Sequence, residues 1–263
     1  MRKALIFLLF LCAALGGNAQ WLVNDSIIDT AQYIETDNLN NLYLIDKSEI
    51  KKYNNKGELL FRYSDMQLGN IGSVDVSYPL RPLLVYPDLN YLVILDNTLS
   101  NNRGKINLLD YNIGLGLLAC SSVQNHFWIY DAMQFALIRV DENFKKVNAT
   151  GNLSQILGID FAPTGMVEFA NKLYINNPST GILVFDIFGT YIKTIPIQDL
   201  THFQIAENEL IYLKNNRLIQ YNTLLFESKE VELPYICRDA QLQKDQIVLL
   251  TDQKVLILKN SNL

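Results

Sequence analysis

Histidine is scarce in this sequence, with only His126 and His202 among 263 residues. Several motifs that build catalytic centres are absent as well, namely Gly-x-Ser-x-Gly, His-Glu-x-x-His, Cys-x-x-Cys and Gly-x-Gly-x-x-Gly. Their absence argues against a serine hydrolase, a zinc peptidase and a dinucleotide-binding enzyme. The sequence therefore favours a non-catalytic protein over an enzyme, and it marks no catalytic residue.

Cysteine is also rare. Of the three copies, Cys12 lies in the apolar segment near the N-terminus, which leaves Cys120 and Cys237 in the body of the chain. Two cysteines in so long a chain do not make the disulfide framework of a small secreted domain. The repeats described below place them in opposite blades. We expect both to be free thiols and mostly buried.

Positive charge is in deficit, because 22 Lys and Arg face 27 Asp and Glu, for a net charge of −5. A chain this acidic has no general attraction for nucleic acid or for anionic lipid. We therefore expect no nucleic-acid partner.

The N-terminus has the pattern of a signal peptide. Arg2 and Lys3 precede an apolar run over residues 4–15, and the small residues Gly17 and Ala19 predict cleavage before Gln20. The apolar run is shorter than the roughly 20 residues that a membrane-spanning helix needs. The sequence thus predicts a signal peptide over 1–19 and an exported protein over 20–263 with no transmembrane segment. It would be periplasmic, associated with the outer membrane, or extracellular.

The remaining chain is built from six copies of one pattern. An Asn turn is followed by an apolar run, a closing polar residue, a short gap and a second apolar run. The central runs are residues 42–46, 92–96, 127–131, 173–177, 210–214 and 247–251. The turn residues, which tolerate positive φ, are Asn40, Asn90, Asn125, Asn171, Asn208 and Asp245.

These copies recur about every 40 residues with four short strands each, which is the signature of a propeller blade. The last copy stops after its third strand, and residues 21–23 or 26–28 offer a spare strand before the first copy. That strand can complete the last blade and remove an exposed sheet edge. We predict an all-β, six-bladed β-propeller of four-stranded antiparallel blades, closed by an N-terminal strand. A β-sandwich and an open β-solenoid are the alternatives.

Residues 37–57, which run from Asp37 to Gly57, resemble an NHL-type propeller repeat, and the other copies match more loosely. The chain as a whole resembles uncharacterised six-bladed propellers secreted by Bacteroidota, and the Asn-Ala-Gln end of the leader is similar to theirs. The resemblance implies the fold and export, and it carries no activity.

Loop length indicates where function lies on such a scaffold. Residues 62–81, 97–105 and 148–165 depart from the minimal repeat, and the sequence frame places them on the face that holds the connections between blades. We therefore predict an interaction face made of Asp75, Tyr78, Arg81, Asp160, His202, Arg238 and Asp239. The two histidines fall in loops on opposite faces, so a metal site made of both is not expected.

Six-bladed lactonase-type propellers hold calcium in the central channel, which this fold resemblance makes an alternative. The first strands offer Glu35, Asp37, Glu168 and Asp239 as oxygen ligands, but these share no frame, and calcium needs several converging oxygens. We expect no cofactor.

The sequence is compatible with three functional hypotheses. A non-catalytic module would bind a protein or glycan partner in the cell envelope, a subunit would belong to a larger envelope assembly, and a cation-dependent hydrolase or lactonase is the enzymatic alternative. Ser26 and Thr30 follow Asp25 and Asp29 in short motifs similar to Bacteroidota O-glycosylation sites.

Overall fold

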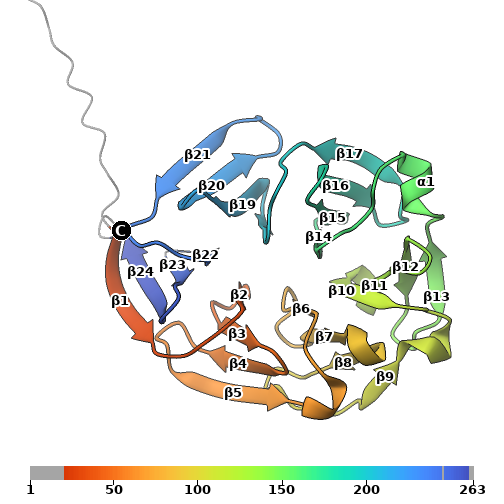
Figure 1. Cartoon of the computed structure of the whole chain (residues 1–263), viewed down its shortest axis with the longest axis horizontal. Helices are drawn as coiled ribbons and strands as arrows, with labels where there is room; N and C mark the ends of the chain where they lie inside the picture. Colours follow the sequence, from red (N-terminus) through yellow and green to blue (C-terminus); the bar gives the residue numbers. More distant parts are fainter. Residues whose placement is uncertain (1–20, 245, 261–263) are drawn as a thin grey trace, which may run out of the picture.

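The computed structural model describes residues 21–244 and 246–260. The predicted signal peptide, residues 1–19, lies outside the described residues. Six four-stranded antiparallel sheets stand around a central axis (Figure 1). The predicted six-bladed β-propeller is therefore confirmed, and within the described residues helix is confined to α1 (Leu153–Leu157) and four short 3-10 turns.

The first three blades follow chain order, each from its innermost to its outermost strand. Blade one consists of β2 (Tyr33–Thr36), β3 (Leu42–Asp46), β4 (Glu49–Tyr53) and β5 (Leu59–Ser64). Blade two consists of β6 (Ser73–Asp75), β7 (Leu83–Tyr86), β8 (Tyr91–Ile94) and β9 (Lys105–Asn107). Blade three consists of β10 (Gly116–Ser122), β11 (His126–Asp131), β12 (Ala136–Val140) and β13 (Lys146–Ala149).

The last three blades continue the same order until the ring closes. Blade four consists of β14 (Gly165–Phe169), β15 (Lys172–Asn177), β16 (Gly181–Asp186) and β17 (Tyr191–Ile195). Blade five consists of β18 (Gln204–Ala206), β19 (Glu209–Lys214), β20 (Arg217–Asn222) and β21 (Ser228–Glu232). Blade six consists of β22 (Asp239–Gln243), β23 (Gln246–Leu250), β24 (Val255–Asn260) and β1 (Trp21–Ile27).

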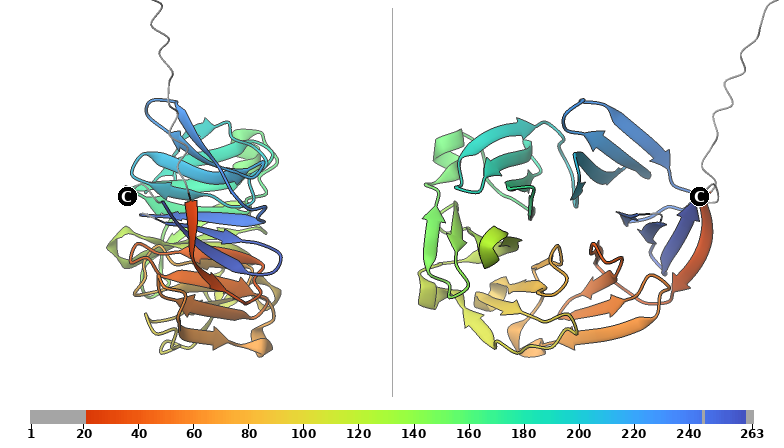
Figure 2. Two further views of the ribbon diagram at one scale, coloured as in Figure 1. Left: turned by 90° about the vertical axis from the view of Figure 1, so that its left-hand side faces the viewer. Right: turned by 180° about the vertical axis from the view of Figure 1, so that it is seen from behind.

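The two flat sides of the disc, seen edge-on in Figure 2, carry different loops. Because the strands of a blade are antiparallel, the connections between blades share one side with the turns between second and third strands. We call this the connection side. The turns between first and second strands and between third and fourth strands lie on the other side, which we call the turn side.

The core lies between the blades. The middle strands are buried on both faces, since each blade is packed between two others, and they therefore read as continuous apolar runs rather than alternating ones. Strand β11 is an example, with five consecutive buried residues ending at Asp131. One apolar cluster joins Leu83 and Val85 of blade two to Phe127 and Ile129 of blade three.

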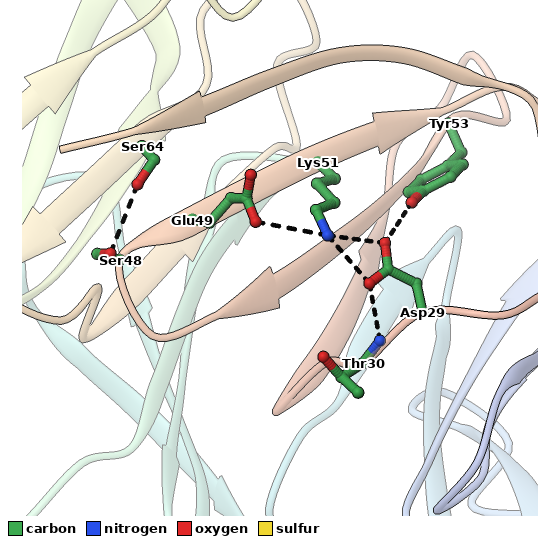
Figure 3. Close-up of polar contacts among 7 residues, drawn as sticks. All are labelled: Asp29, Thr30, Ser48, Glu49, Lys51, Tyr53 and Ser64. Carbon is green, nitrogen blue, oxygen red and sulfur yellow. Dashed lines mark hydrogen bonds and ion pairs between the residues drawn. The ribbon is translucent and has the colours of Figure 1, made fainter. Parts of the chain in front are cut away.

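The ring is closed by its two ends, as predicted. Strand β1 pairs antiparallel with β24, with Ile27 opposite Val255. The segment that leaves β1 is then tied to blade one by Asp29, whose carboxylate accepts hydrogen bonds from Lys51 Nζ at 2.8 and 3.0 Å and from Tyr53 Oη at 2.6 Å (Figure 3). Closure therefore rests on a sheet edge that is paired and on a polar contact beside it.

Blade two corrects the predicted frame by one strand. The sequence frame aligned residues 92–96 with the second strands of the other copies, but β6 (Ser73–Asp75) is the first strand and pairs with β7, so residues 92–94 belong to the third strand, β8. With Val74 as its one apolar residue and a long loop after it, β6 gives no apolar pattern. Asp96 therefore follows the third strand, and its Oδ1 accepts the backbone N–H groups of Thr98 and Ser100.

The predicted positive φ at the Asn turns is confirmed for Asn40, Asn90, Asn125 and Asn171, with φ between 56° and 62°. In blade five the positive φ falls one residue earlier, on Glu207 at 52°. Asp245 lies outside the described residues.

Candidate functional site

The innermost strands enclose a cavity of about 890 Å³ along the axis of the ring. Its wall is formed by the first strand of each blade and by the turns that follow these strands. Apolar and polar side chains alternate along this wall because neighbouring residues of a strand point to different sides. Pockets of this size accommodate small organic ligands or the side chains of a partner.

Several polar side chains on the inner strands join neighbouring blades. Asp239 of blade six accepts the backbone N–H of Ile34 in blade one at 3.0 Å. Asp75 of blade two accepts the N–H of Ser121 in blade three at 2.7 Å. The side-chain oxygen of Gln204 in blade five accepts the N–H of Leu242 in blade six at 2.7 Å.

Glu168 makes the most extensive of these links. Its carboxylate accepts hydrogen bonds from Ser122 Oγ at 2.5 Å, from Trp128 Nε1 at 2.8 Å and from the backbone N–H of Val123 at 3.0 Å. All three donors belong to blade three, whereas Glu168 belongs to blade four. These carboxylates are thus structural, because their oxygens are occupied by fixed donors.

Glu35 is different. It lines the cavity from β2. In the part of the chain that the structure describes, its carboxyl makes no hydrogen bond, and its pKa is set by burial and by neighbouring charges. Burial raises the pKa of Glu35 to about 8; the charge of His202 acts to lower it, and those of Asp239 and Asp75 act to raise it further. Glu35 was proposed from sequence as a calcium ligand, and its lack of partners was not foreseen.

His202 lies beside this carboxyl on the connection side. Its Nδ1 is 3.3 Å from Asp239 Oδ2, and its ring is 5.0 Å from the ring of Tyr33. Burial disfavours the charged imidazolium, but Asp239 and the charge of Glu35 outweigh it and raise the pKa of His202. The structure thus brings together His202 and Asp239, which the sequence analysis assigned to the same face.

The predicted interaction face is divided between the two sides. Asp160, His202, Arg238 and Asp239 lie in or next to connections between blades, on the connection side. Arg238 donates to the carbonyl of Ala31 at 3.1 Å and pairs with Asp252. Asp160 is exposed.

Asp75, Tyr78 and Arg81 occupy the turn side, contrary to the predicted grouping, because the overlooked β6 moves their loop from a connection to the turn between first and second strands. There the Arg81 guanidinium covers the ring of Phe127 at 4.4 Å and that of Tyr78 at 5.4 Å. Residues 97–105 also belong to this side, in the turn between β8 and β9.

The four residues considered for calcium do not converge. Asp37 accepts four hydrogen bonds from its own turn, including one from Tyr43 Oη at 2.9 Å, and Glu168 and Asp239 serve the links described above. Among residues 21–244 and 246–260, no three His, Cys, Asp or Glu side chains lie together in a way that could hold a metal ion.

The two histidines lie on opposite sides, as expected. His126 begins β11 on the turn side, whereas His202 precedes β18 on the connection side. None of the helices within the described ranges has the length and apolarity to cross a bilayer.

Exposed apolar side chains on the connection side were missed by the sequence reading. Gly69 lies against Asp88, Gly114 lies against Met133, and the carbonyl of Phe135 accepts the N–H of Leu153 at 2.8 Å. These contacts place the surrounding loops of blades two to four side by side. We call the exposed set the apolar ridge, which consists of Met66, Leu89, Leu109, Met133, Phe135 and Ile156.

No family model matches the chain, and no curated protein matches it either. The predicted kinship with NHL-type repeats and with Bacteroidota propellers stays a prediction. Solved structures do match. The WD40 domain of Pan2 from Neurospora crassa is 9% identical with a TM-score of 0.61, covering 94% of this chain and 97% of that one.

Two further propellers match equally broadly. Streptogramin B lyase is 12% identical with a TM-score of 0.59, covering 91% of this chain and 97% of that one. BamB from Moraxella catarrhalis is 10% identical with a TM-score of 0.56, covering 93% and 99%. At such identities the likeness concerns the fold alone. The chain is a β-propeller with six blades, and it shares the propeller fold with a WD40 domain and with a protein named a lyase.

Proposed function

We propose that this chain is an exported, non-catalytic interaction module that binds a protein partner of the cell envelope through its connection side. The observation that carries the proposal is the apolar ridge. Met66 and Met133 are 85% and 69% exposed, and the loops that hold the ridge residues are in contact across three blades. Exposed apolar side chains gathered on one side of a molecule favour a protein partner over a glycan.

The fold neighbours do not decide between binding and catalysis, since one is a WD40 domain and another is named a lyase. The chemistry of the ridge favours binding. Methionine and leucine side chains supply adaptable apolar contact area, and no nucleophile or general base stands among them. Two of the ridge residues, Met66 and Ile156, lie in the long connections 65–72 and 150–164.

The test is capture of a partner with matched variants. The protein with a C-terminal tag would be cross-linked in whole cells of its source, purified, and the co-purified proteins quantified by mass spectrometry. Met66→Glu combined with Met133→Glu places two negative charges on the ridge, while Leu225→Glu places one negative charge on a 66% exposed apolar residue of the turn side.

We expect one stoichiometric partner with the unchanged protein and with Leu225→Glu, and at least a tenfold loss of it with the double variant, roughly the effect of removing a binding hot spot. Equal melting temperatures of the three proteins would exclude misfolding. A partner retained by the double variant, or no partner at all, would overturn the proposal.

A further inference from the structure

We propose that the central cavity binds an organic cation, an amine attached to an apolar or aromatic body, with the carboxyl of Glu35 as its counter-ion. This inference concerns the channel and not the apolar ridge. It can therefore hold or fail independently of the proposed interaction with a protein.

The first argument is that, within the described residues, Glu35 is the carboxyl of the innermost strands that no donor holds, whereas Glu207, which also lines the cavity, lies exposed in the turn after β18. Asp37, Asp75 and Glu168 also line the cavity, but each is held by donors of its own turn or of the neighbouring blade. Glu35 is half-buried, and burial favours the neutral form of a carboxyl unless donors or cations offset it. The structure supplies such partners to the other three and leaves this requirement open at Glu35.

The second argument is the sign of the local charge. The groups whose charges reach Glu35 are His202, Asp239 and Asp75, which are one base and two acids. His202 is itself paired with Asp239 at 3.3 Å. The site is therefore net negative before Glu35 ionises, which favours a cationic ligand over an anionic one. Of the other cations that line the cavity, Arg81 is engaged by the aromatic rings of Phe127 and Tyr78 on the turn side, and Lys244 is exposed in the turn after β22.

The third argument is the aromatic lining. Tyr33, Phe169 and Phe203 face the cavity together with Met166 and Val167. Aromatic faces attract organic ammonium ions, and apolar walls bind the body that carries them.

The protonation of Glu35 makes the binding measurable. With a pKa of about 8, the carboxyl is mostly protonated in the free protein at neutral pH. A bound ammonium group favours the carboxylate and lowers that pKa, so binding at pH 7 releases a proton. Affinity should then rise with pH up to and beyond pH 8. Burial raises the pKa of the neighbouring Tyr33, which stays neutral throughout.

The experiment uses phenethylammonium as the probe and 2-phenylethanol, its neutral counterpart, as the control ligand. Calorimetry at pH 7 in two buffers of different ionisation enthalpy gives the dissociation constant and the number of protons released. Glu35→Gln removes the charge while keeping the shape. Glu207→Gln is the matched control, because Glu207 is a second, exposed carboxylate on the cavity wall.

We expect the ammonium ion to bind at least about tenfold more tightly than the alcohol, as for a charge-assisted hydrogen bond, with proton release. The preference for the ammonium ion and the proton release should both disappear in Glu35→Gln and persist in Glu207→Gln. Equal binding of the two ligands, unchanged binding to Glu35→Gln, or no heat with phenethylammonium would overturn the proposal. So would a melting-temperature rise with calcium chloride that phenethylammonium does not produce, because the site would then be one for a metal ion.

Discussion

The hydroxyl of Tyr53 donates a hydrogen bond of 2.6 Å to the carboxylate of Asp29. Tyr53 ends a strand of blade one, whereas Asp29 lies in the segment that leaves the closing strand β1. Lys51 donates to the same carboxylate, so two side chains of β4 hold the segment where the ring closes (Figure 3). A contact of this kind stabilises closure only while Asp29 is charged.

Asp29→Asn should lower the free energy of unfolding at pH 7 by about 1–2 kcal/mol, the value of a charge-assisted hydrogen bond reduced by partial exposure. Burial alone raises the pKa of Asp29, but the hydrogen bonds from Lys51 and Tyr53 outweigh it and lower the pKa below 3.8. The stabilisation is therefore complete above that pH and is lost as the pH falls through the folded-state pKa. Urea unfolding of both proteins at pH 7 and at acid pH tests this.

Asp25→Asn is the control for that measurement, since Asp25 lies on β1 and, among the residues that the structure describes, its carboxylate accepts only from its neighbour Asn24, at 3.3 Å. It should leave stability nearly unchanged. If the two variants lose the same amount, the contact between Asp29 and Tyr53 has no special part in closure.

Glu168→Ala should lower stability by about 2–3 kcal/mol, because three donors of blade three lose their acceptor at once. One of them is the indole of Trp128, which is fully buried. Trp128 is one of two tryptophans in the chain. A large part of the fluorescence therefore reports on this site, and the emission should shift in the variant. Glu142→Ala changes an exposed glutamate of blade three. We expect it to change neither the stability nor the emission of Trp128.

The two histidines should titrate on opposite sides of pH 6.5. Burial, followed by the charge of Arg139, lowers the pKa of His126, whereas Asp239 raises that of His202 against the effect of burial. Proton NMR can follow both, and His126→Gln assigns the signals. Asp239→Asn should lower the pKa of His202 and leave that of His126 unchanged.

The raised pKa of His202 also affects the stability of the fold. A histidine with a raised folded-state pKa stabilises the fold below its unfolded pKa of about 6.5, and this contribution is lost as pH rises through the folded value. His202→Gln should therefore lose stability at pH 5.5 and approach the unchanged protein at pH 9. A constant difference across this range would show that the charge of His202 is not involved.

Cys120 and Cys237 should differ in reactivity toward a thiol reagent at pH 8. Burial raises the pKa of both thiols, to about 11 for Cys237 and well above its ordinary value for the fully buried Cys120. We expect slow labelling of Cys237 and labelling of Cys120 only after unfolding, since the thiolate is the reactive form. Rapid modification of either residue in the folded protein contradicts this.

Much of the architecture could be predicted because it is encoded locally. The buried run of β3, Leu42–Asp46, and the Asn40 turn before it lie next to each other in the sequence, and similar units recur around the ring. Closure by Trp21–Ile27 followed from the missing outer strand of the last copy. The prediction failed for blade two because Ser73–Asp75 is too short and too polar to show a strand period. The missed strand also led to the placement of Tyr78 and Arg81 on the wrong side.

The sequence by itself thus determined the number of blades, their strand order in five of six cases and the closure of the ring, since adjacent residues form those patterns. Only the tertiary structure decided which polar groups meet in the channel. Asp239 caps the N–H of Ile34 across a separation of 205 residues, and Glu35, one position further along, has no such partner. No local pattern distinguishes these two carboxylates, because their surroundings arise only when six blades come together around one axis.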